Sequence, residues 1–365
     1  MNVNILLNEM LDQQASDIHL KVGSPPLWRI DGKLINFGDE KLTPKLTEEV
    51  ANQLMTEQQK QKFQQKNEID IAKDLGDWRL RANICRQRGT VAISLRIISQ
   101  KILSFDELNL PAVLKEIAME QRGLILVTGT AGSGKSTTLA AMINYINENK
   151  AANIVTIEDP IEYIHSDKKS CISQREVGVD TESFACALKN ILRQDPDVCM
   201  VGEMRDYETI SAGVTAAETG HLVMSSLHTI DASQTVDRII DSFPVEQQTQ
   251  IRGQLAATLT AVISLRLLAK TGGAGRVPGV EILLATPTVR TLIREQKTSQ
   301  IKSAIQSGIT QYGMQTFDQS LLGLYQKGLI KMEDALAEAT SASELKLAID
   351  GIVSGSAGTQ VKMKR

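Results

Sequence analysis

The chain has 365 residues, a length that predicts two or three domains. Apolar residues make up 42% of it and charged residues 23%, which excludes a disordered chain. The formal charge is −3, whereas a general binder of nucleic acid or anionic membrane is expected to be basic, so no nucleic-acid partner is expected. The four cysteines form no CxxC pair, which argues against a disulfide framework or a four-thiolate zinc site.

No segment of the sequence is typical of a membrane span or of a signal peptide. Apolar stretches such as 124–127 and 260–268 are far shorter than the roughly 18 residues that a span needs. The N-terminus also lacks a basic start followed by a long apolar block. We therefore expect a cytoplasmic protein.

The first hundred residues mix helical and alternating patterns. Turn signals at 23–26 and at Asp31-Gly32 separate the first strands, and Thr43-Pro44 begins a polar helix. The pattern predicts a small α+β domain over 1–98, with helices at 3–14 and 44–65 and strands at 17–22, 27–30, 68–73, 78–86 and 90–98.

The pattern then changes to apolar strands that alternate with helices, which predicts an α/β domain with a largely parallel sheet covered on both faces. A linker and connecting helix (99–121) lead to this core (122–285), which is followed by helices (286–350) and a frayed tail (351–365). The core strands are expected at 123–128, 153–157, 198–201 and 222–227, with helices from near 135 and at 182–193 and 206–218.

The segment Gly129–Ser136 matches GxxxxGK[ST] between an apolar strand and a helix start. Glycines allow successive N–H groups to surround phosphate oxygens, and the helix N-terminus favours an anion. Lys135 is expected to reach the β- and γ-phosphates, and Ser136 to bind Mg²⁺. A plain glycine-rich turn is the alternative. The predicted nucleotide-binding residues are Gly129, Thr130, Ala131, Gly132, Ser133, Gly134, Lys135, Ser136 and Thr137.

Two acidic segments follow strands of the same domain. Glu203 closes a strand that resembles a Walker B strand, although Gly202 stands where an aspartate is usual. We expect Glu203 to act on the magnesium shell through water, and Glu162 to polarise the attacking water. Taken alone, each carboxylate could instead be a cap or a surface ion-pair partner.

His221 and His228 bracket the strand predicted at 222–227. Their spacing matches no common zinc motif, so a metal site is rejected. An imidazole at a strand end can sense the γ-phosphate, which makes both residues catalytic candidates. A structural histidine bonded to backbone is the alternative, and it carries more weight for His221 than for His228.

The first domain contains a run of five arginines without lysine or acid between positions 79 and 96. Arginine suits bidentate phosphate contacts. In a ring of subunits, Arg81 and Arg96 could enter a neighbour's nucleotide site as arginine fingers. A solvated sheet face is the alternative, and so is a nucleic-acid patch, although Trp78 alone among aromatic residues borders the run.

The order of these motifs resembles that of the secretion-superfamily hexameric ATPases and, within them, the type IV pilus retraction ATPases. The resemblance runs from the Ala15–Leu20 segment to about residue 330. It includes the segments Arg175–Gly178, Ala217–His221, Asp237–Asp241 and Thr288–Glu295, the last of which is tied in this family to retraction rather than to hydrolysis. Spacing places Val289, Leu292 and Ile293 on one buried face of a helix, and Arg290 and Arg294 on another.

The resemblance implies a PAS-like N-terminal domain, a RecA-like ATPase core and a cytoplasmic homohexamer at the inner-membrane face that binds ATP and Mg²⁺ between the two domains. By motif position, Glu162 is the water-activating carboxylate, Glu203 the Walker B glutamate, and Arg81 and Arg96 the fingers. The implied partners are the inner-membrane platform protein of the pilus, through it the pilin subunits, and a paralogous retraction ATPase.

The chain departs from this family at two places. Thr130-Ala131 replaces the usual Pro-Thr, and Met224–Ser226 replaces Phe-Gly-Thr. These changes leave open a paralogue, or an accessory ring subunit with weak hydrolysis. A pilus-assembly or type II secretion ATPase is a further alternative, although the chain lacks the long N-terminal region and four-cysteine insert of that group. A nucleic-acid translocase is a more distant one.

Overall fold

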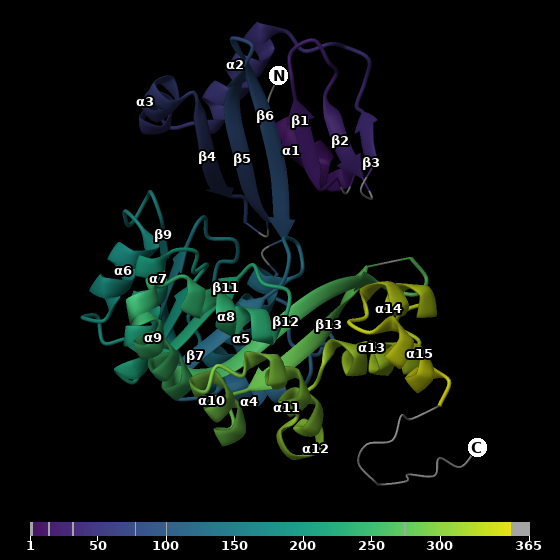
Figure 1. Ribbon diagram of the computed structural model, residues 1–365. Coiled ribbons are helices and arrows are strands. Elements are labelled where there is room, and N and C mark those ends of the chain that lie inside the picture. Colours follow the sequence, from purple (N-terminus) through teal and green to yellow (C-terminus); the bar gives the residue numbers. More distant parts are fainter. Residues whose placement is uncertain are drawn as a thin grey trace. The chain divides into compact units, whose positions relative to one another are not determined.

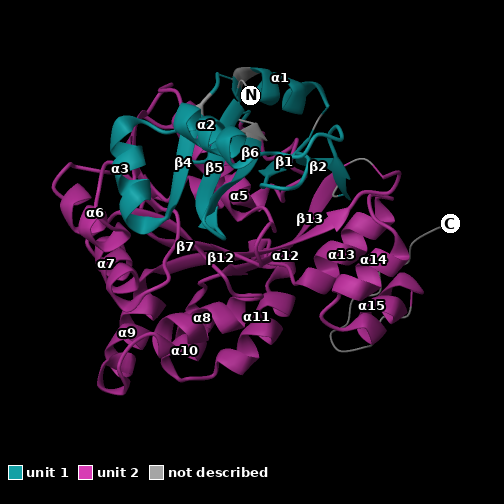
Figure 2. Cartoon of the chain, turned by 90° about the horizontal axis from the view of Figure 1, so that it is seen from above, with its two compact units in different colours: residues 1–101, 160–164 teal, residues 102–159, 165–365 magenta. Residues whose placement is uncertain are grey.

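The computed structural model describes residues 3–13, 15–30, 33–76, 78–99, 101–273 and 275–351 (Figure 1). The turn expected at Asp31-Gly32 and the tail expected beyond residue 351 lie outside the described residues. The chain forms two compact units (Figure 2). Unit 1 comprises residues 1–101 and 160–164, and unit 2 comprises residues 102–159 and 165–365.

Unit 1 is an antiparallel six-stranded sheet with the order β3-β2-β1-β6-β5-β4. Three helices supply side chains to one face of this sheet, where they form the core of the unit with Trp28 and residues of β5. The elements are α1 (Val3–Asp12), β1 (Asp17–Leu20), β2 (Leu27–Ile30), β3 (Lys33–Asn36), α2 (Pro44–Leu54), α3 (Glu57–Lys66), β4 (Glu68–Asp74), β5 (Trp78–Gln87) and β6 (Thr90–Ser99).

Two details of unit 1 differ from the sequence prediction. Strand β3 was not predicted, and the single helix expected over 44–65 is wrong. Met55 is extended and ends α2, and Thr56 begins α3 with a capping box, in which its hydroxyl accepts from the Gln59 N–H while the Gln59 side chain accepts from the Thr56 N–H. Local capping therefore breaks a helix that contains neither glycine nor proline at the break.

Unit 2 is built on a seven-stranded sheet with the order β13-β12-β7-β11-β10-β8-β9. All neighbouring pairs are parallel except β12 with the edge strand β13. The strands are β7 (Gly123–Thr128), β8 (Asn153–Glu158), β9 (Cys171–Glu176), β10 (Val198–Val201), β11 (Leu222–Leu227), β12 (Leu259–Ala269) and β13 (Arg276–Leu284). Strands β9, β12 and β13 were not predicted.

Helices cover both faces of this sheet, as the alternation of apolar strands predicts. One face packs against α4 (Val113–Ala118) and α5 (Lys135–Asn149). The other packs against α6 (Phe184–Ile191), α7 (Tyr207–Glu218), α8 (Ala232–Asp241), α9 (Val245–Thr258), α10 (Pro287–Arg294) and α11 (Ile301–Ser307). The mixed α/β fold class is confirmed.

The described chain beyond β13 is helical, as expected. After α10 and α11 come α12 (Ile309–Tyr312), α13 (Phe317–Gln326), α14 (Met332–Glu338) and α15 (Ala342–Ile349). The last three form a small core with Leu268 and Val277 of the β12–β13 pair, beside which Figure 1 shows them. Across the described residues, we find no helix that has both the length and the apolar character to cross a bilayer.

Candidate nucleotide site

The loop between β7 and α5 has the backbone geometry that phosphate binding requires. Gly129, Gly132 and Gly134 have φ values of 143°, 77° and 96°, which L side chains rarely adopt. A Cβ atom on Gly129 would also lie 2.5 Å from the Leu265 carbonyl oxygen and 2.5 Å from the Ser133 hydroxyl. Because α5 begins immediately after this loop, its unpaired N–H groups and helix dipole favour an anion at the same place.

The Lys135 ammonium lies against the backbone of this loop. Its Nζ donates to the carbonyl oxygens of Gly129 at 3.0 Å and of Thr130 at 2.9 Å, and it lies 3.4 Å from Nδ1 of His228. The residue is 8% exposed. A phosphate oxygen that replaces one of these acceptors would keep the buried charge paired, which is why Lys135 fits a triphosphate.

Glu203 follows β10 and is bound on two sides. Its Oε1 lies 3.1 Å from Nε2 of His228 and accepts a hydrogen bond from Nε of Arg205. The hydrogen bond from Arg205 to Glu203 raises the pKa of that guanidinium. If Nδ1 of His228 accepts from Lys135, Nε2 carries the proton and donates to Glu203. His228 therefore links Lys135 to Glu203, and Arg205 is a contact that was not predicted.

Two serines hold the ends of β10 and β11 together. The Ser225 and Ser226 hydroxyls donate to the carbonyl oxygens of Val201 and Gly202, both at 2.7 Å. Both serines belong to the Met224–Ser226 segment that departs from the family pattern, and their bonds fix the strand end that precedes Glu203. A Cβ atom on Gly202 would lie 3.3 Å from the Ile157 carbonyl oxygen, so the position is crowded for the aspartate that is usual there.

The residues near the loop fit a magnesium ion only as part of a nucleotide complex. Among the described residues, no three histidine, cysteine or carboxylate side chains are grouped to hold a metal by themselves. Ser136 is exposed in the first turn of α5, and Glu203 is bound by His228 and Arg205. Mg²⁺ is often held by few protein ligands, with phosphates and waters supplying the others, and Ser136 and Glu203 fit that arrangement.

Known proteins resemble this chain along most of its length. The model of the family described as type II/IV secretion system protein matches residues 1–353. The type IV pilus retraction ATPase PilT of Pseudomonas aeruginosa is 45% identical over 93% of this chain and 98% of its own length. The type IV pilus ATPase PilU of the same organism is 42% identical over 96% of this chain and 91% of its own. A crystal structure of the retraction motor PilT with bound ADP superposes with a TM-score of 0.87 at 46% identity, covering 95% of this chain and 99% of that one.

The chain belongs to the type II/IV secretion system protein family. Within this family it is a nucleotide-binding ATPase similar to PilT, which confirms the family suggested by its motifs. The loop Gly129–Ser136 has a backbone geometry that suits phosphates, and its nucleotide-binding role stays a prediction.

His221 and His228 lie at opposite ends of β11. His221 precedes β11 at Leu222, whereas His228 follows the strand at Leu227, and six strand residues span about 20 Å. Nδ1 of His221 lies 3.0 Å from the Ala216 carbonyl oxygen and 3.0 Å from the Thr219 hydroxyl. These contacts fit the structural alternative for His221, and its role at the phosphates with His228 stays a prediction.

The two predicted arginine fingers lie in unit 1 on one face of the sheet. Arg81 is directly opposite Arg96, which is directly opposite Asp17, itself opposite Arg29. Nε of Arg96 donates to Asp17 at 2.7 Å, while 61% of the Arg96 side chain remains exposed. Burial raises the pKa of Asp17, but hydrogen bonds from Ser16 and Arg96 outweigh it, so that the net pKa is lowered. Asp17 thus holds its charge and offsets the repulsion between the paired arginines.

Glu162 also belongs to unit 1, within residues 160–164, where it is half-buried. Its role in polarising water stays a prediction, as do the finger roles of Arg81 and Arg96 and the metal-binding roles of Ser136 and Glu203. The remaining predicted loop residues differ in burial. Ser133 is buried and Thr137 half-buried, whereas Thr130 and Ala131 are exposed.

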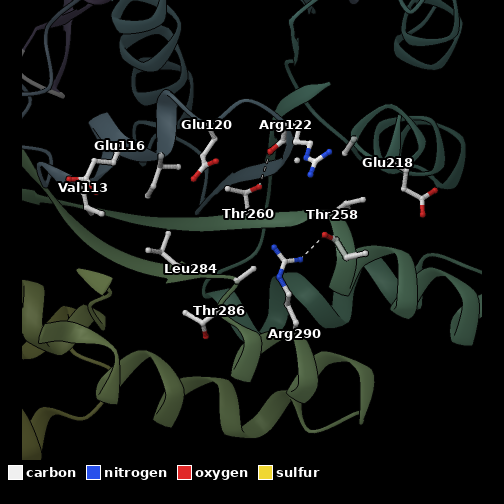
Figure 3. Close-up of a pocket in the computed structure, with 15 residues that line it drawn as sticks. Val113, Glu116, Glu120, Arg122, Glu218, Thr258, Thr260, Leu284, Thr286 and Arg290 are labelled. Atoms are coloured by element: carbon white, nitrogen blue, oxygen red, sulfur yellow. Dashed lines mark hydrogen bonds between the residues drawn. The ribbon is translucent and has the colours of Figure 1, made fainter. Parts of the chain in front are cut away.

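The segment Thr288–Glu295 contributes to α10 and to a cavity of about 700 Å³ at the amino edge of the sheet, where β7 begins (Figure 3). Val289 and Ile293 are fully buried and Leu292 half-buried, as their spacing predicts. Arg290 lines the cavity, and its Nη1 donates to the carbonyl oxygens of Ala256 at 2.5 Å and Ala257 at 2.6 Å. Arg290 therefore caps the C-terminus of α9.

Proposed function

We propose that this chain is the ATPase motor of type IV pilus retraction, the activity that drives twitching motility. It works as a cytoplasmic homohexamer at the inner-membrane face, where ATP hydrolysis turns the platform protein and withdraws pilin subunits from the fibre. The observation that carries the proposal is the contact of His228 with both Lys135 and Glu203 beside a phosphate loop. The proposal is also supported by the similarity of nearly the whole chain to a known retraction ATPase.

In the proposed reaction, the backbone N–H groups of Gly129–Ser136 and the N-terminus of α5 hold the triphosphate. Lys135 exchanges a loop carbonyl for a β- or γ-phosphate oxygen. Because His228 touches both Lys135 and Glu203, a move of Lys135 toward phosphate changes the surroundings of the glutamate. Mg²⁺, held by Ser136 and through water by Glu203, would neutralise charge that develops on the phosphates.

Two further roles depend on residues of unit 1. Glu162 polarises the attacking water, and Arg81 and Arg96 contact the phosphates bound by a neighbouring copy. The Arg81–Arg96 pairing supports a joint role, because adjacent guanidinium groups suit an anion and Asp17 binds Arg96 through Nε, leaving its outer nitrogens for another contact.

The enzymatic part is tested by steady-state ATP hydrolysis of the purified chain. Lys135→Ala and Glu203→Ala are each expected to lower kcat at least about a hundredfold, because both remove a charged group beside the transferred phosphoryl. The exposed Glu246, far along the chain in α9, provides a matched control, and Glu246→Ala is expected to keep full activity. Equal activity of wild type and Lys135→Ala would refute the assignment.

The physiological part is tested in cells. Deleting the gene is expected to leave surface pili and abolish twitching, whereas loss of pili would instead indicate pilus assembly. Arg81→Ala and Arg96→Ala are expected to lower turnover without unfolding the protomer, and unchanged turnover of the assembled ring would reject the finger role.

A paralogous role is the second candidate, with this chain acting beside a main retraction ATPase. It is favoured by the 42% identity to PilU over 96% of this chain, close to the 45% found for PilT. Complementation distinguishes the two roles. A main motor restores twitching in a strain that lacks its retraction ATPase, whereas a paralogue restores it only when that ATPase is present.

A further inference from the structure

A carboxylate is buried in β13, within the apolar run that follows Arg276. Glu281 is 5% exposed and lies on the same sheet face as Leu283. Its Oε1 accepts the N–H of Ala232, the first residue of α8, at 2.9 Å. Buried carboxylates are rare without a reason in structure or function. The hydrogen bond from Ala232 indicates that the Glu281 carboxylate stabilises the start of α8.

Glu281 ends a row of buried polar side chains that starts at the phosphate loop. Thr128, which immediately precedes Gly129, donates to the Ser264 hydroxyl at 2.9 Å, and Ser264 is directly opposite Glu281 across the β12–β13 pair. Thr128 and Ser264 are fully buried. The row therefore runs across three strands from the base of the phosphate loop to the start of α8.

The segment that Glu281 holds carries His228. After β11, His228 is followed by Thr229, Ile230 and Asp231, and then by α8. The hydrogen bonds described next join residues within this segment and α8, or join α8 to the chain that follows α10. Thr229 and Thr235 share a hydrogen bond at 2.6 Å, Asp231 caps Gln234, and Ser233 donates to the Thr298 carbonyl. Among the described residues, Glu281 is the side chain of the central sheet that accepts a hydrogen bond from the start of α8.

The charges that face Glu281 come from three elements. Burial is the largest influence and raises the pKa of its carboxyl, while the N–H of Ala232 lowers it. Asp231 at the start of α8 raises it further, and Arg266 of β12 and Lys302 of α11 lower it. The net pKa is about 7, so the carboxyl changes charge within the physiological range.

We propose that Glu281 is a positioning residue for the ATPase reaction, whose carboxylate fixes the start of α8 and thereby holds His228 between Lys135 and Glu203. The inference rests on the catalytic roles proposed for His228 and Glu203. As the anion, Glu281 accepts the N–H at a helix N-terminus, where negative charge is favoured. As the neutral acid, it binds this N–H less strongly, and His228 is held less firmly.

The test compares three variants. Glu281→Leu removes the acceptor, Glu281→Gln keeps an acceptor but no charge, and Ile282→Val is the control. Ile282 is fully buried on the opposite face of β13, so the control loosens the core without touching α8. Hydrogen exchange of peptides from residues 229–235, kcat for ATP, and the Kd of a fluorescent ADP analogue are measured on the assembled protein.

Glu281→Leu is expected to speed amide exchange in residues 229–235 and to lower kcat about tenfold, with the Kd for ADP within twofold of wild type. Ile282→Val is expected to change none of these. The ratio of kcat of wild type to that of Glu281→Gln is expected to rise about two- to threefold as pH increases from 6 to 8, because only wild type gains the anion.

Unchanged exchange at residues 229–235 in Glu281→Leu would overturn the anchoring role, whatever the enzyme does. Faster exchange with unchanged kcat would instead overturn the link to catalysis. If Glu281→Leu does not fold, the Gln variant decides, and a ratio of kcat values that stays flat between pH 6 and 8 refutes the proposal. A failed retraction assay would bear on the proposed function alone.

Discussion

Arg290 gives the sharpest test of how the Thr288–Glu295 segment works. Spacing alone places Arg290 and Arg294 together on a surface of α10, where both could contact a partner. In the structure, Arg290 is half-buried and donates to the last-turn carbonyl oxygens of α9, whereas Arg294 is exposed. Burial and the nearby Arg294 charge lower the pKa of Arg290. Arg290→Ala should therefore destabilise unit 2, and Arg294→Ala should not.

The magnitude follows from the contacts that are lost. A hydrogen bond with a charged partner contributes about 1.5–3 kcal/mol, and a cation at a helix C-terminus about 0.3–1 kcal/mol. Solvation of the freed carbonyls and regained side-chain freedom offset part of this sum, which leaves about 2 kcal/mol. For a unit of this size, that corresponds to a Tm lowered by about 4–8 °C. Arg294→Ala should stay within about 0.5 kcal/mol of wild type.

Urea unfolding of both variants, followed by circular dichroism, measures the difference as a shift in the midpoint at constant slope. ATP hydrolysis per folded protein should stay within about twofold of wild type for both, because Arg290 lines a cavity at the amino edge of the sheet and the phosphate loop follows its carboxyl edge. Equal urea midpoints for Arg290→Ala and Arg294→Ala would refute the capping role of Arg290. Arg290 would then be interpreted, like Arg294, as a surface residue of α10.

The phosphate loop was predictable because its chemistry is local. Glycines with positive φ, a lysine and a helix start must be contiguous in sequence to form the site, so Gly129–Ser136 carried the information by itself. The strand at 222–227 was likewise placed correctly, since its apolar run has clear ends. Contacts between strands are different. The bonds from Lys135 to His228 and from His228 to Glu203 join three strand ends, and spacing along the chain does not encode their distances.

The separation of His221 from His228 was predictable from the sequence. Two residues that bracket one strand lie at its opposite ends, and ligands of a parallel sheet gather at the carboxyl ends. His221 precedes β11 and His228 follows it, so the same pattern that located the strand already separated them. Glu281 was also recognisable in the sequence as a single carboxylate within an apolar run. Its hydrogen bond to α8, however, is known only from the structure.

Three further predictions concern the loop, the histidines and Glu281. Gly129→Ala should abolish nucleotide binding, because the added Cβ would clash with the Leu265 carbonyl oxygen and the φ angle at this position is unfavourable for alanine. Binding is measured with a fluorescent ADP analogue. An affinity equal to that of wild type would contradict the loop geometry. An asparagine side chain can reproduce the hydrogen bond of Nδ1 but not that of Nε2. His228→Asn should therefore lower kcat at least about tenfold, and His221→Asn should lower it less than about twofold. Equal losses of kcat in the two variants would indicate that His221 also acts in the reaction. For Glu281, the folded pKa is raised from 4.5 to about 7, so the folded state binds the proton more tightly than the unfolded state. The contribution of this bound proton to the free energy of unfolding is complete below pH 4.5 and is lost as the pH rises to about 7. At about 1.4 kcal/mol per pH unit, the change in the free energy of unfolding is on the order of 3 kcal/mol. Glu281→Gln lacks this loss, so its free energy of unfolding relative to wild type should increase between pH 5 and 8 in urea titrations. A difference that does not change with pH would mean that the carboxyl is not held in the buried position that links β13 to α8.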